Sequence, residues 1–413
     1  MKLNQLLKLA FLVIAGLFAA TLSAQNTWAR KADFGGKVRS SSTSFSIGGK
    51  GYMCTGDSNA ATSFTQDLWQ FDPVTNTWTQ KADFPGSLRS GATSFTIGSK
   101  GYVGLGWDSF NYFTDFYAYD TLTNAWSSIA PFPGTGRRRA KAFTIGSKAY
   151  VGVGQDASGG LNDFYEYDPT LNTWTLLANF PATARYDATS FSVASKGYIG
   201  LGYDGSGFYA DFYSYDPISN SWAAIANFPD TARYGAAAFG IGNIGYVVSG
   251  YGNGAYFNHL WSYDPFINQW TIKATMPAVG RIDASSCTIN GKGYVGLGWN
   301  NRVYQNDYYE YTPGCVQTEP TGISELITKT GSNTFRVFPT PSSGILNVDF
   351  ENGLNDKTSL TLINYLGQVV YSENIPNGTT LWNHDFSSLD GGIYTLLCLN
   401  RSGKKAQRVI LFH

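Results

Sequence analysis

The stretch "DFYEYDPTLNTW" at residues 163–174 decides the fold, because near-copies of it recur along the chain. The copies read "DLWQFDPVTNTW" (67–78), "DFYAYDTLTNAW" (115–126), "DFYSYDPISNSW" (211–222) and "HLWSYDPFINQW" (259–270). Each contains an alternating aromatic segment that favours a strand, then a turn rich in Asp, Pro and Asn, then a tryptophan. A sixth copy, "DYYEYTPGC" at 307–315, begins in the same way but lacks the final tryptophan.

Two further motifs keep the spacing of this stretch. Its tryptophans lie at 28, 78, 126, 174, 222 and 270, separated by 50 and then by 48 residues. An arginine recurs at the same step, at Arg39, Arg89, Arg137, Arg185, Arg233 and Arg281. A tyrosine-glycine segment also recurs, as "GYMCTG", "GYVGLG", "AYVGVG", "GYIGLG", "GYVVSG" and "GYVGLG". A period near 50 residues in strand-like sequence predicts a radial array of repeats.

Each repeat divides into four predicted strands. In the second repeat they are 92–97, 101–106, 115–120 and a segment that starts at 124. Residues 26–315 resemble the kelch-repeat β-propellers, through the Tyr of the second strand, the Tyr-Asp-Pro of the third and the Trp of the fourth. One departure is a Gly-x-Gly, as in Gly104-Leu105-Gly106, where the family usually has Gly-Gly. The resemblance implies an all-β propeller of six blades.

The broken sixth copy has its missing end at the N-terminus. The sequence "QNTWARKADF" supplies Asn26-Thr27-Trp28, the end of a repeat without its beginning. We therefore expect the strand of Trp28 to pair with the strand at 307–312 and to close the sixth blade, which removes an exposed sheet edge. On this prediction Trp28→Ala destabilises the ring by the ~3–5 kcal/mol typical of a buried Trp truncation.

The N-terminal sequence predicts export. Residues 1–24 carry Lys2 and Lys8, then an apolar run from Leu9 to Leu22 that is too short to span a bilayer comfortably, then Ser23-Ala24. We interpret this segment as a signal peptide, which leaves no transmembrane segment in the mature chain. Formal net charge is zero, with 29 basic and 29 acidic residues, so nothing predicts nucleic acid as a partner.

The last part of the chain lacks the repeat motifs and has a different pattern of residues. Residues 316–334 read as a linker, and 335–413 as about seven short strands of an immunoglobulin-like β-sandwich. The segments "VFPTPSSGIL" (337–346), "YLGQVVY" (365–371), "LDGGIYTLLCLNRSG" (389–403) and the basic stretch before an apolar end at 404–412 resemble the C-terminal sorting domain of the type IX (Por) secretion system of Bacteroidetes. The resemblance implies that this machinery is a partner, that the domain is often cleaved, and that the protein is secreted or held at the outer-membrane surface after passing the periplasm.

The propeller domain, expected over 25–315, has one face with candidate ligand-binding residues. In a four-stranded meander, the loops that carry the six arginines lie on the same face as the variable loops after the second strand. The copies disagree there, and the candidate residues are Arg138, Arg139, Lys141, Trp107, Tyr203, Tyr251, Trp299, Asp108, Asp156 and Asp204. Aromatic rings beside Asp, Asn and Arg are suited to a sugar or an extended peptide. The six repeated arginines bind either ligand or, as symmetric structural residues, the carbonyls of a neighbouring blade.

Three classes of function remain open from the sequence. The first is a binding module for a glycan or a protein, which needs no catalytic set. The second is a carbohydrate-active enzyme, such as the kelch-type sialic-acid mutarotases, whose anionic sugar would suit the arginines. The third is a structural adhesin or spacer. The sequence argues against the copper chemistry of the kelch-like radical oxidases, which need two His and two Tyr, because His259 is the only histidine in the repeats.

No cofactor or metal site is predicted. Glutamates in the repeats are limited to Glu166 and Glu310, both in the third strand, so no carboxylate pair for glycoside hydrolysis is evident. The four cysteines, Cys54, Cys287, Cys315 and Cys398, lack metal-binding spacing. We interpret Cys54 and Cys287 as buried thiols, and a Cys315–Cys398 disulfide stays open. These patterns favour binding over catalysis.

Overall fold

The computed structural model describes residues 26–58, 63–301, 303–314, 335–340, 342–350, 353–354, 357–364, 369–400 and 403–411. The predicted signal peptide, the linker and Cys315 lie outside these residues. Two compact units are present, Met1–Val316 and Gln317–His413. Every regular element in the described residues is a strand, and none of them is a helix that could cross a membrane.

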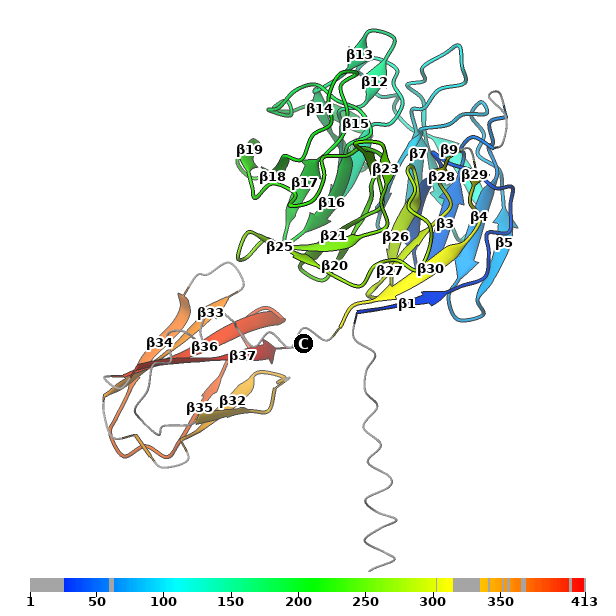
Figure 1. Cartoon of the computed structure of the whole chain (residues 1–413). Coiled ribbons are helices and arrows are strands. Elements are labelled where there is room, and N and C mark those ends of the chain that lie inside the picture. The colour runs from blue at the N-terminus through cyan, green and yellow to red at the C-terminus, as the bar shows by residue number, and fades with distance from the viewer. Residues whose placement is uncertain are drawn as a thin grey trace, which may run out of the picture. The chain divides into compact units, whose positions relative to one another are not determined.

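The first unit contains six four-stranded antiparallel sheets, which confirms the predicted all-β propeller. Blade 1 contains β2 (Thr43–Ile47), β3 (Lys50–Cys54), β4 (Leu68–Asp72) and β5 (Thr77–Lys81). Blade 2 contains β6 (Thr93–Ile97), β7 (Lys100–Gly104), β8 (Phe116–Asp120) and β9 (Ala125–Ser128). Blade 3 contains β10 (Lys141–Ile145), β11 (Lys148–Gly152), β14 (Phe164–Asp168) and β15 (Thr173–Leu176). Within each blade the strands follow one another as a meander (Figure 1).

The remaining blades follow the same plan. Blade 4 contains β16 (Thr189–Val193), β17 (Lys196–Gly200), β18 (Phe212–Asp216) and β19 (Ser221–Ala224). Blade 5 contains β20 (Ala237–Ile241), β21 (Ile244–Val248), β24 (Leu260–Asp264) and β25 (Gln269–Ile272). Blade 6 contains β26 (Ser285–Ile289), β27 (Lys292–Gly296), β30 (Tyr308–Thr312) and, from the other end of the chain, β1 (Thr27–Arg30). Three short hairpins extend the loops of blades 3, 5 and 6: β12 (Gln155–Asp156) with β13 (Gly159–Gly160), β22 (Tyr251–Gly252) with β23 (Ala255–Tyr256), and β28 (Trp299–Asn300) with β29 (Val303–Tyr304).

Blade 6 is completed by the N-terminal strand. Strand β1 lies beside β30 (Figure 1). The two strands pair antiparallel, with Trp28 opposite Tyr311. Blade 6 in turn contacts blade 1, because Ser44 Oγ donates to the carbonyl of Ser286 at 2.8 Å. The same inner-strand hydroxyl contact links other neighbouring blades, for example Ser190 Oγ to the carbonyl of Ala142 at 3.0 Å. The propeller is therefore closed by a strand from its N-terminus.

The Asn-x-Trp motif joins the outer strands of neighbouring blades. The indole N–H of each Trp donates to a carbonyl just beyond the outer strand of the preceding blade, as Trp174 does to Ala130 at 2.9 Å. The Asn two residues earlier adopts a positive φ, 53° at Asn172, and its Oδ1 accepts the N–H of the same Ala130 at 2.9 Å. Asn tolerates this left-handed conformation better than most residues, which explains its place in the motif.

The hydrophobic core of the propeller lies between the blades. Each cluster combines residues of two neighbours, as where Phe143, Tyr150 and Phe164 of blade 3 pack with Ile199 and Tyr215 of blade 4. The glycine before the tyrosine of the second strand is required here, because a Cβ at Gly197 would overlap the Phe143 ring. The close neighbour of this glycine is therefore an aromatic side chain of the preceding blade.

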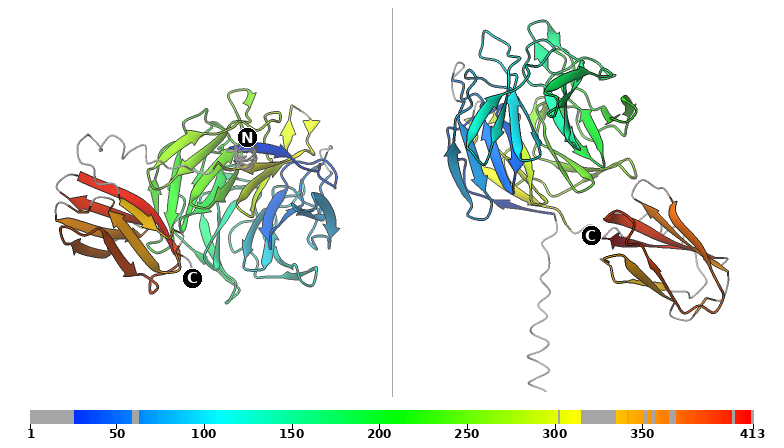
Figure 2. Two further views of the ribbon diagram at one scale, coloured as in Figure 1. Left: turned by 90° about the horizontal axis from the view of Figure 1, so that it is seen from below. Right: turned by 180° about the vertical axis from the view of Figure 1, so that it is seen from behind.

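The second unit is a β-sandwich of two antiparallel sheets (Figure 2). One sheet contains β31 (Phe335–Phe338), β32 (Ile345–Phe350) and β35 (Leu381–Asp385). The other contains β33 (Thr358–Asn364), β34 (Val369–Ile375), β36 (Gly392–Asn400) and β37 (Gly403–Leu411). Its core includes Leu346, Val348, Leu360, Leu396 and Val409, so it has a hydrophobic interior of its own.

Candidate functional site

The six repeated arginines are completely buried, each with an exposed fraction of 0 %. Five of them form ion pairs with the aspartate that precedes the third strand of their own blade: Arg39–Asp67, Arg89–Asp115, Arg137–Asp163, Arg185–Asp211 and Arg281–Asp307. A second guanidinium contact reaches a carbonyl of the same blade, as from Arg185 Nη1 to Leu201 O at 3.0 Å. These guanidinium groups are therefore occupied inside the blades and do not reach the solvent.

The link between blades that we had expected from these arginines is made by their backbone instead. The N–H of the last glycine in the Gly-x-Gly motif donates to the arginine carbonyl of the next blade, as from Gly202 to Arg233 at 2.8 Å. Gly298 of blade 6 makes the same bond to Arg39 of blade 1 at 2.9 Å. The guanidinium cannot make this contact because it already binds within its own blade.

A ring of six residues surrounds the axis of the propeller on this face. Each member lies two residues after a repeated arginine and has a φ between 51° and 64°: Ser41, Gly91, Arg139, Asp187, Gly235 and Asp283. Backbone hydrogen bonds join five of the six adjacent pairs, such as Arg139 N to Gly91 O at 2.7 Å and Gly235 N to Asp187 O at 2.9 Å. Ser41 N donates to Asp283 O at 3.2 Å, which joins the first blade to the last. We call these six residues the axial ring.

Three members of the axial ring are charged and bind one another. The guanidinium of Arg139 pairs with the carboxylates of Asp187 and Asp283, the second at 3.5 Å between Nη2 and Oδ2. Ser41 Oγ also donates to Asp283 Oδ2 at 3.0 Å. Burial raises the pKa of Asp187 to about 6, although the Arg139 charge acts in the opposite direction. The centre of the face is thus a network of paired charges.

Lys141 lies at the start of β10, two residues beyond Arg139. Among the residues that the structure describes, its ammonium group makes no hydrogen bond and no ion pair. Burial lowers the pKa of Lys141, while Asp187 and Asp283 raise it. Its charge therefore interacts with the axial carboxylates at longer range.

A second circle of residues surrounds the axial ring. The residue after each repeated arginine forms a β-bridge with the residue after Gly-x-Gly: Ser40–Asp57, Ser90–Trp107, Arg138–Gln155, Tyr186–Tyr203, Tyr234–Tyr251 and Ile282–Trp299. The structure therefore brings five of the predicted site residues, Arg138, Trp107, Tyr203, Tyr251 and Trp299, onto one circle. Arg138 lies over the Trp107 ring at 4.4 Å, and its Nε donates to Gln155 Oε1 at 3.1 Å.

Aromatic rings form a continuous arc over blades 4, 5 and 6. Tyr186 contacts Tyr203 with ring centroids 5.5 Å apart, and Tyr234 contacts Tyr251 at 5.8 Å. Tyr256 continues the series to Trp299 at 5.7 Å. We call the whole set the aromatic arc, and its members are Tyr186, Tyr203, Phe208, Tyr234, Tyr251, Tyr256 and Trp299. All seven are partly exposed, so the arc offers ring surface to a ligand.

The predicted site residues Asp108, Asp156 and Asp204 lie within the loops of separate blades and are not brought together. Asp204 accepts hydrogen bonds from the N–H groups of Ser206 and Gly207 and from the Tyr209 hydroxyl. The Tyr209 bond, followed by these backbone donors, lowers the pKa of Asp204 well below its ordinary range. Asp108 and Asp156 accept the N–H groups of Phe110 and Ser158 in the same way. These carboxylates shape their loops. No group of three metal-binding side chains occurs in the described residues.

Asp57 of blade 1 occupies the position that Trp107, Gln155 and Tyr203 hold in blades 2 to 4, and it contributes to the axial face. Its carboxylate accepts hydrogen bonds from Ser40 Oγ at 2.8 Å and from the Tyr304 hydroxyl at 2.9 Å. Burial raises the pKa of Asp57, against the effect of these two donors.

In blade 5 the repeated arginine has a different ion-pair partner from those in the other blades. His259 stands where they have the aspartate, and Arg233 pairs instead with Asp230 at 2.7 Å. Asp230 also binds His259 Nδ1 at 3.0 Å and the Trp261 indole N–H at 3.2 Å. Burial acts to raise the pKa of Asp230, but the His259 bond, the Thr231 N–H and the Arg233 charge lower it well below its ordinary range. The lone histidine of the repeats thus hydrogen-bonds the carboxylate of the Arg233–Asp230 ion pair.

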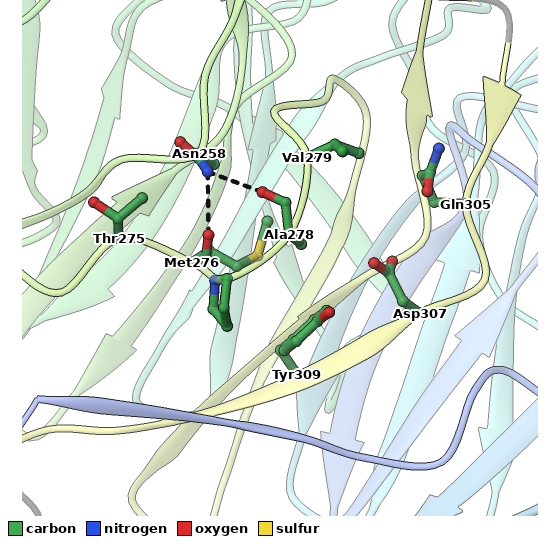
Figure 3. A pocket seen from close by; sticks show the side chains of 9 residues that line it. Asn258, Thr275, Met276, Ala278, Val279, Gln305, Asp307 and Tyr309 are labelled. Atoms are coloured by element: carbon green, nitrogen blue, oxygen red, sulfur yellow. Dashed lines mark hydrogen bonds between the residues drawn. The ribbon is translucent and has the colours of Figure 1, made fainter.

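A shallow recess of about 650 Å³ lies beside β30, at the junction of blades 5 and 6 (Figure 3). It is lined by Asn258, Thr275, Met276, Pro277, Ala278, Val279, Gln305, Asp307 and Tyr309. The other five blades place a phenylalanine at the position of Met276, as Phe180 does under Arg185 with 5.1 Å from Cζ to the ring centroid. Met276 is thinner than a phenyl ring, which explains why the recess occurs at this junction.

The two cysteines that we interpreted as buried thiols are both buried and free. Cys54 has an exposed fraction of 0 % and Cys287 of 7 %. Burial raises the pKa of Cys287 to about 12 and raises that of Cys54 as well. Both thiols therefore stay protonated and unreactive at neutral pH.

Sequence reasoning missed Asp187 and Asp283 while it selected Arg139. All three occupy the same position of the repeat, two residues after the arginine, where the copies read Ser, Gly, Arg, Asp, Gly and Asp. This disagreement among the copies was the available signal. Tyr186, Tyr234 and Phe208 were also missed. Their contacts with the other rings of the arc form between separate loops and are not evident from the sequence.

Comparison with known proteins supports the fold and the route of export. Residues 336–411 match the secretion system C-terminal sorting domain. This tail indicates export by the type IX system, with which it interacts, and a secreted or cell-surface location. No curated protein matched the chain. A solved structure titled "Structure of YjhT" is 17 % identical with a TM-score of 0.57, over 67 % of this chain and 95 % of that chain. At this identity the likeness shows the fold alone.

Proposed function

We propose that the propeller is a recognition module that binds a glycan or a protein on the axial face, outside the cell. The axial face here means the axial ring, the aromatic arc, Asp57, Arg138, Lys141 and Trp107. One observation carries the proposal: the six repeated arginines are buried in their blades, whereas side chains that differ between blades gather on this face. A scaffold needs its shared residues, whereas a ligand without six-fold symmetry needs the residues that differ.

Several features of the face support recognition. The axial ring is held by backbone hydrogen bonds, and Arg138 is held between Trp107 and Gln155, so both are positioned before a ligand arrives. Such preorganisation lowers the entropic cost of binding. Partly exposed aromatic rings on the arc add area that a ligand can cover.

The test is binding by the full exported chain to immobilised glycan and peptide arrays. We expect signal on at least one array, and a loss of about tenfold in affinity for Arg138→Ala, because a preorganised charged contact is removed. The matched control is Leu122→Ala, a residue with an exposed fraction of 88 % in the turn between β8 and β9. Equal loss in both variants, or blank arrays, would contradict the proposal and favour a spacer role.

A second candidate is catalysed proton transfer on a sugar, such as anomer exchange. The observation in its favour is Asp187, a buried carboxyl at the centre of the face whose pKa is raised by burial to about 6. A carboxyl with this pKa can exchange a proton near neutral pH. The experiment is NMR measurement of anomer exchange with free sugars, and a rate that falls in Asp187→Asn would favour this candidate over simple binding.

A further inference from the structure

The two arginines of the axial face are engaged by protein groups before a ligand binds, whereas the Lys141 ammonium has no direct partner among the described residues. The six repeated arginines have an exposed fraction of 0 %, so they offer no positive surface. Arg139 is shared by the carboxylates of Asp187 and Asp283, and Arg138 is stacked on Trp107. The repeated arginines therefore offer an anionic ligand no positive surface, and Arg139 already binds two carboxylates.

The numbers of cationic and acidic side chains on the axial face also argue against an anionic ligand. The described axial side chains include three cations, Arg138, Arg139 and Lys141, and three carboxylates, Asp57, Asp187 and Asp283. The loops above them add the carboxylates of Asp108, Asp156 and Asp204. By this count the described face is neutral to acidic, so it offers phosphates and carboxylated sugars no net attraction.

The main chain of the face is also paired, which argues against an extended peptide. Tyr234 and Tyr251 exchange both backbone hydrogen bonds, at 3.0 Å each, and Tyr186 and Tyr203 do the same at 3.0 and 2.9 Å. A peptide that adds as a strand needs unpaired backbone groups at a sheet edge. What these residues leave for a ligand is ring surface and hydroxyl groups.

The aromatic arc indicates where an extended ligand would lie, from blade 4 to blade 6. Its rings run from blade 4 to blade 6 without a break, whereas blade 3 presents Arg138, Gln155 and a glycine hairpin at Gly159–Gly160. Sugar rings have apolar faces that stack on aromatic rings and hydroxyl edges that bind polar groups. A chain of sugars can contact the arc along its length while its hydroxyls reach the paired carboxylates of the axial ring.

We infer that the ligand is an uncharged oligosaccharide that lies along the aromatic arc with hydroxyl groups directed to Arg139 and Asp283, the more exposed charged members of the axial ring. The inference rests on the proposed recognition function and narrows its ligand to one chemical class. An anionic sugar was considered because the repeated arginines could bind it. These arginines are buried in ion pairs and cannot contact such a ligand.

The experiment is calorimetric titration of the full exported chain with neutral oligosaccharides of two to six units from several backbones. Each is compared with the same oligosaccharide oxidised to carboxylate at C6. We expect at least one neutral series to bind with affinity that rises with length, and its oxidised form to bind at least about tenfold more weakly, since the face is neutral to acidic.

Variants separate stacking from folding. Tyr251→Ala should lower the affinity for the neutral oligosaccharide by about tenfold, whereas Tyr251→Phe, which keeps the ring, should stay within about threefold. Phe110→Ala is the control, because Phe110 has an exposed fraction of 86 % but lies outside the arc. Equal or tighter binding of oxidised sugars, affinity independent of length, or binding on the peptide array alone would overturn the inference while recognition stands. Blank results on every array would overturn recognition itself.

Discussion

The indole N–H of Trp28 donates to the carbonyl oxygen of Ala274 at 2.7 Å, across 246 positions of sequence. The other five repeat tryptophans make the same contact to the preceding blade, for example Trp270 to Ala226 at 2.9 Å. Trp28 also packs on Tyr311 with ring centroids 5.1 Å apart. A residue at the very start of the described chain therefore joins blade 6 to blade 5.

Trp28→Ala should lower the free energy of unfolding by about 2–3 kcal/mol. The expected loss is below the ~3–5 kcal/mol of a fully buried Trp, because Trp28 is only partly buried and loses packing plus one hydrogen bond. Urea denaturation of the exported chain measures it. Trp28→Phe, which keeps a ring but no N–H, should lose less, and unchanged stability in Trp28→Ala would show that the closure contributes nothing.

Asp230→Ala should destabilise blade 5 by about 3–5 kcal/mol, because Arg233 is left as a buried charge without its carboxylate. The double variant Asp230→Ala with His259→Asp recreates the pairing of the other blades, where the aspartate precedes the third strand. We expect this second change to restore most of the stability, measured by thermal and urea unfolding. Failure of the double variant to recover would refute the exchange of partners described for this blade.

The axial carboxyl Asp187 should make stability depend on pH. Burial raises its pKa to about 6 in the folded chain, above the value of about 3.9 for an unfolded aspartate. As pH falls, Asp187 is therefore protonated in the folded state before it is protonated in the unfolded state. Its contribution to the free energy of unfolding should rise by about 1 kcal/mol when the pH is lowered from 7 to 5. The measurement is the difference in unfolding free energy between wild type and Asp187→Asn at both pH values. An identical pH dependence in the two proteins would contradict it.

Met276→Phe should fill the recess between blades 5 and 6. The new ring should lie under Arg281, as Phe180 lies under Arg185, and stabilise the propeller by about 0.5–1 kcal/mol. Met276→Leu is the control of similar volume without a ring. Destabilisation by the phenylalanine would mean that the recess is too shallow to accept it.

The sequence allowed much of the scaffold to be predicted because its signals are local and repeated. Aromatic alternation, Asp-Pro and Asn turns, and a constant step between tryptophans led to four strands per blade and to the strand of Trp28 as the missing partner. The burial of the arginines was harder to predict from the sequence. Their partners, such as Asp211, lie 26 positions away, and nothing in the sequence distinguishes them from surface aspartates.

The candidate site was predicted only in part. Arg138 and Arg139 stood out because they interrupt the repeat, and Trp107 and Trp299 because they follow Gly-x-Gly. Asp108, Asp156 and Asp204 looked equivalent to them, yet each bonds to its own loop. Whether an aspartate caps a turn or faces a ligand depends on where neighbouring N–H groups point, and a pattern of residue types does not carry that direction.

The repeat thus determined the number of blades, the strands within each and the closing role of the N-terminus, because hydrophobic period and turn chemistry act over a few residues. Tertiary structure alone decided which charges meet. Arg139, Asp187 and Asp283 lie 48 and 96 residues apart and become neighbours only when six blades surround one axis. The repeated arginines pair within their own blades, whereas the aromatic arc forms only where blades 4, 5 and 6 adjoin, so the character of the face follows from the arrangement of the blades.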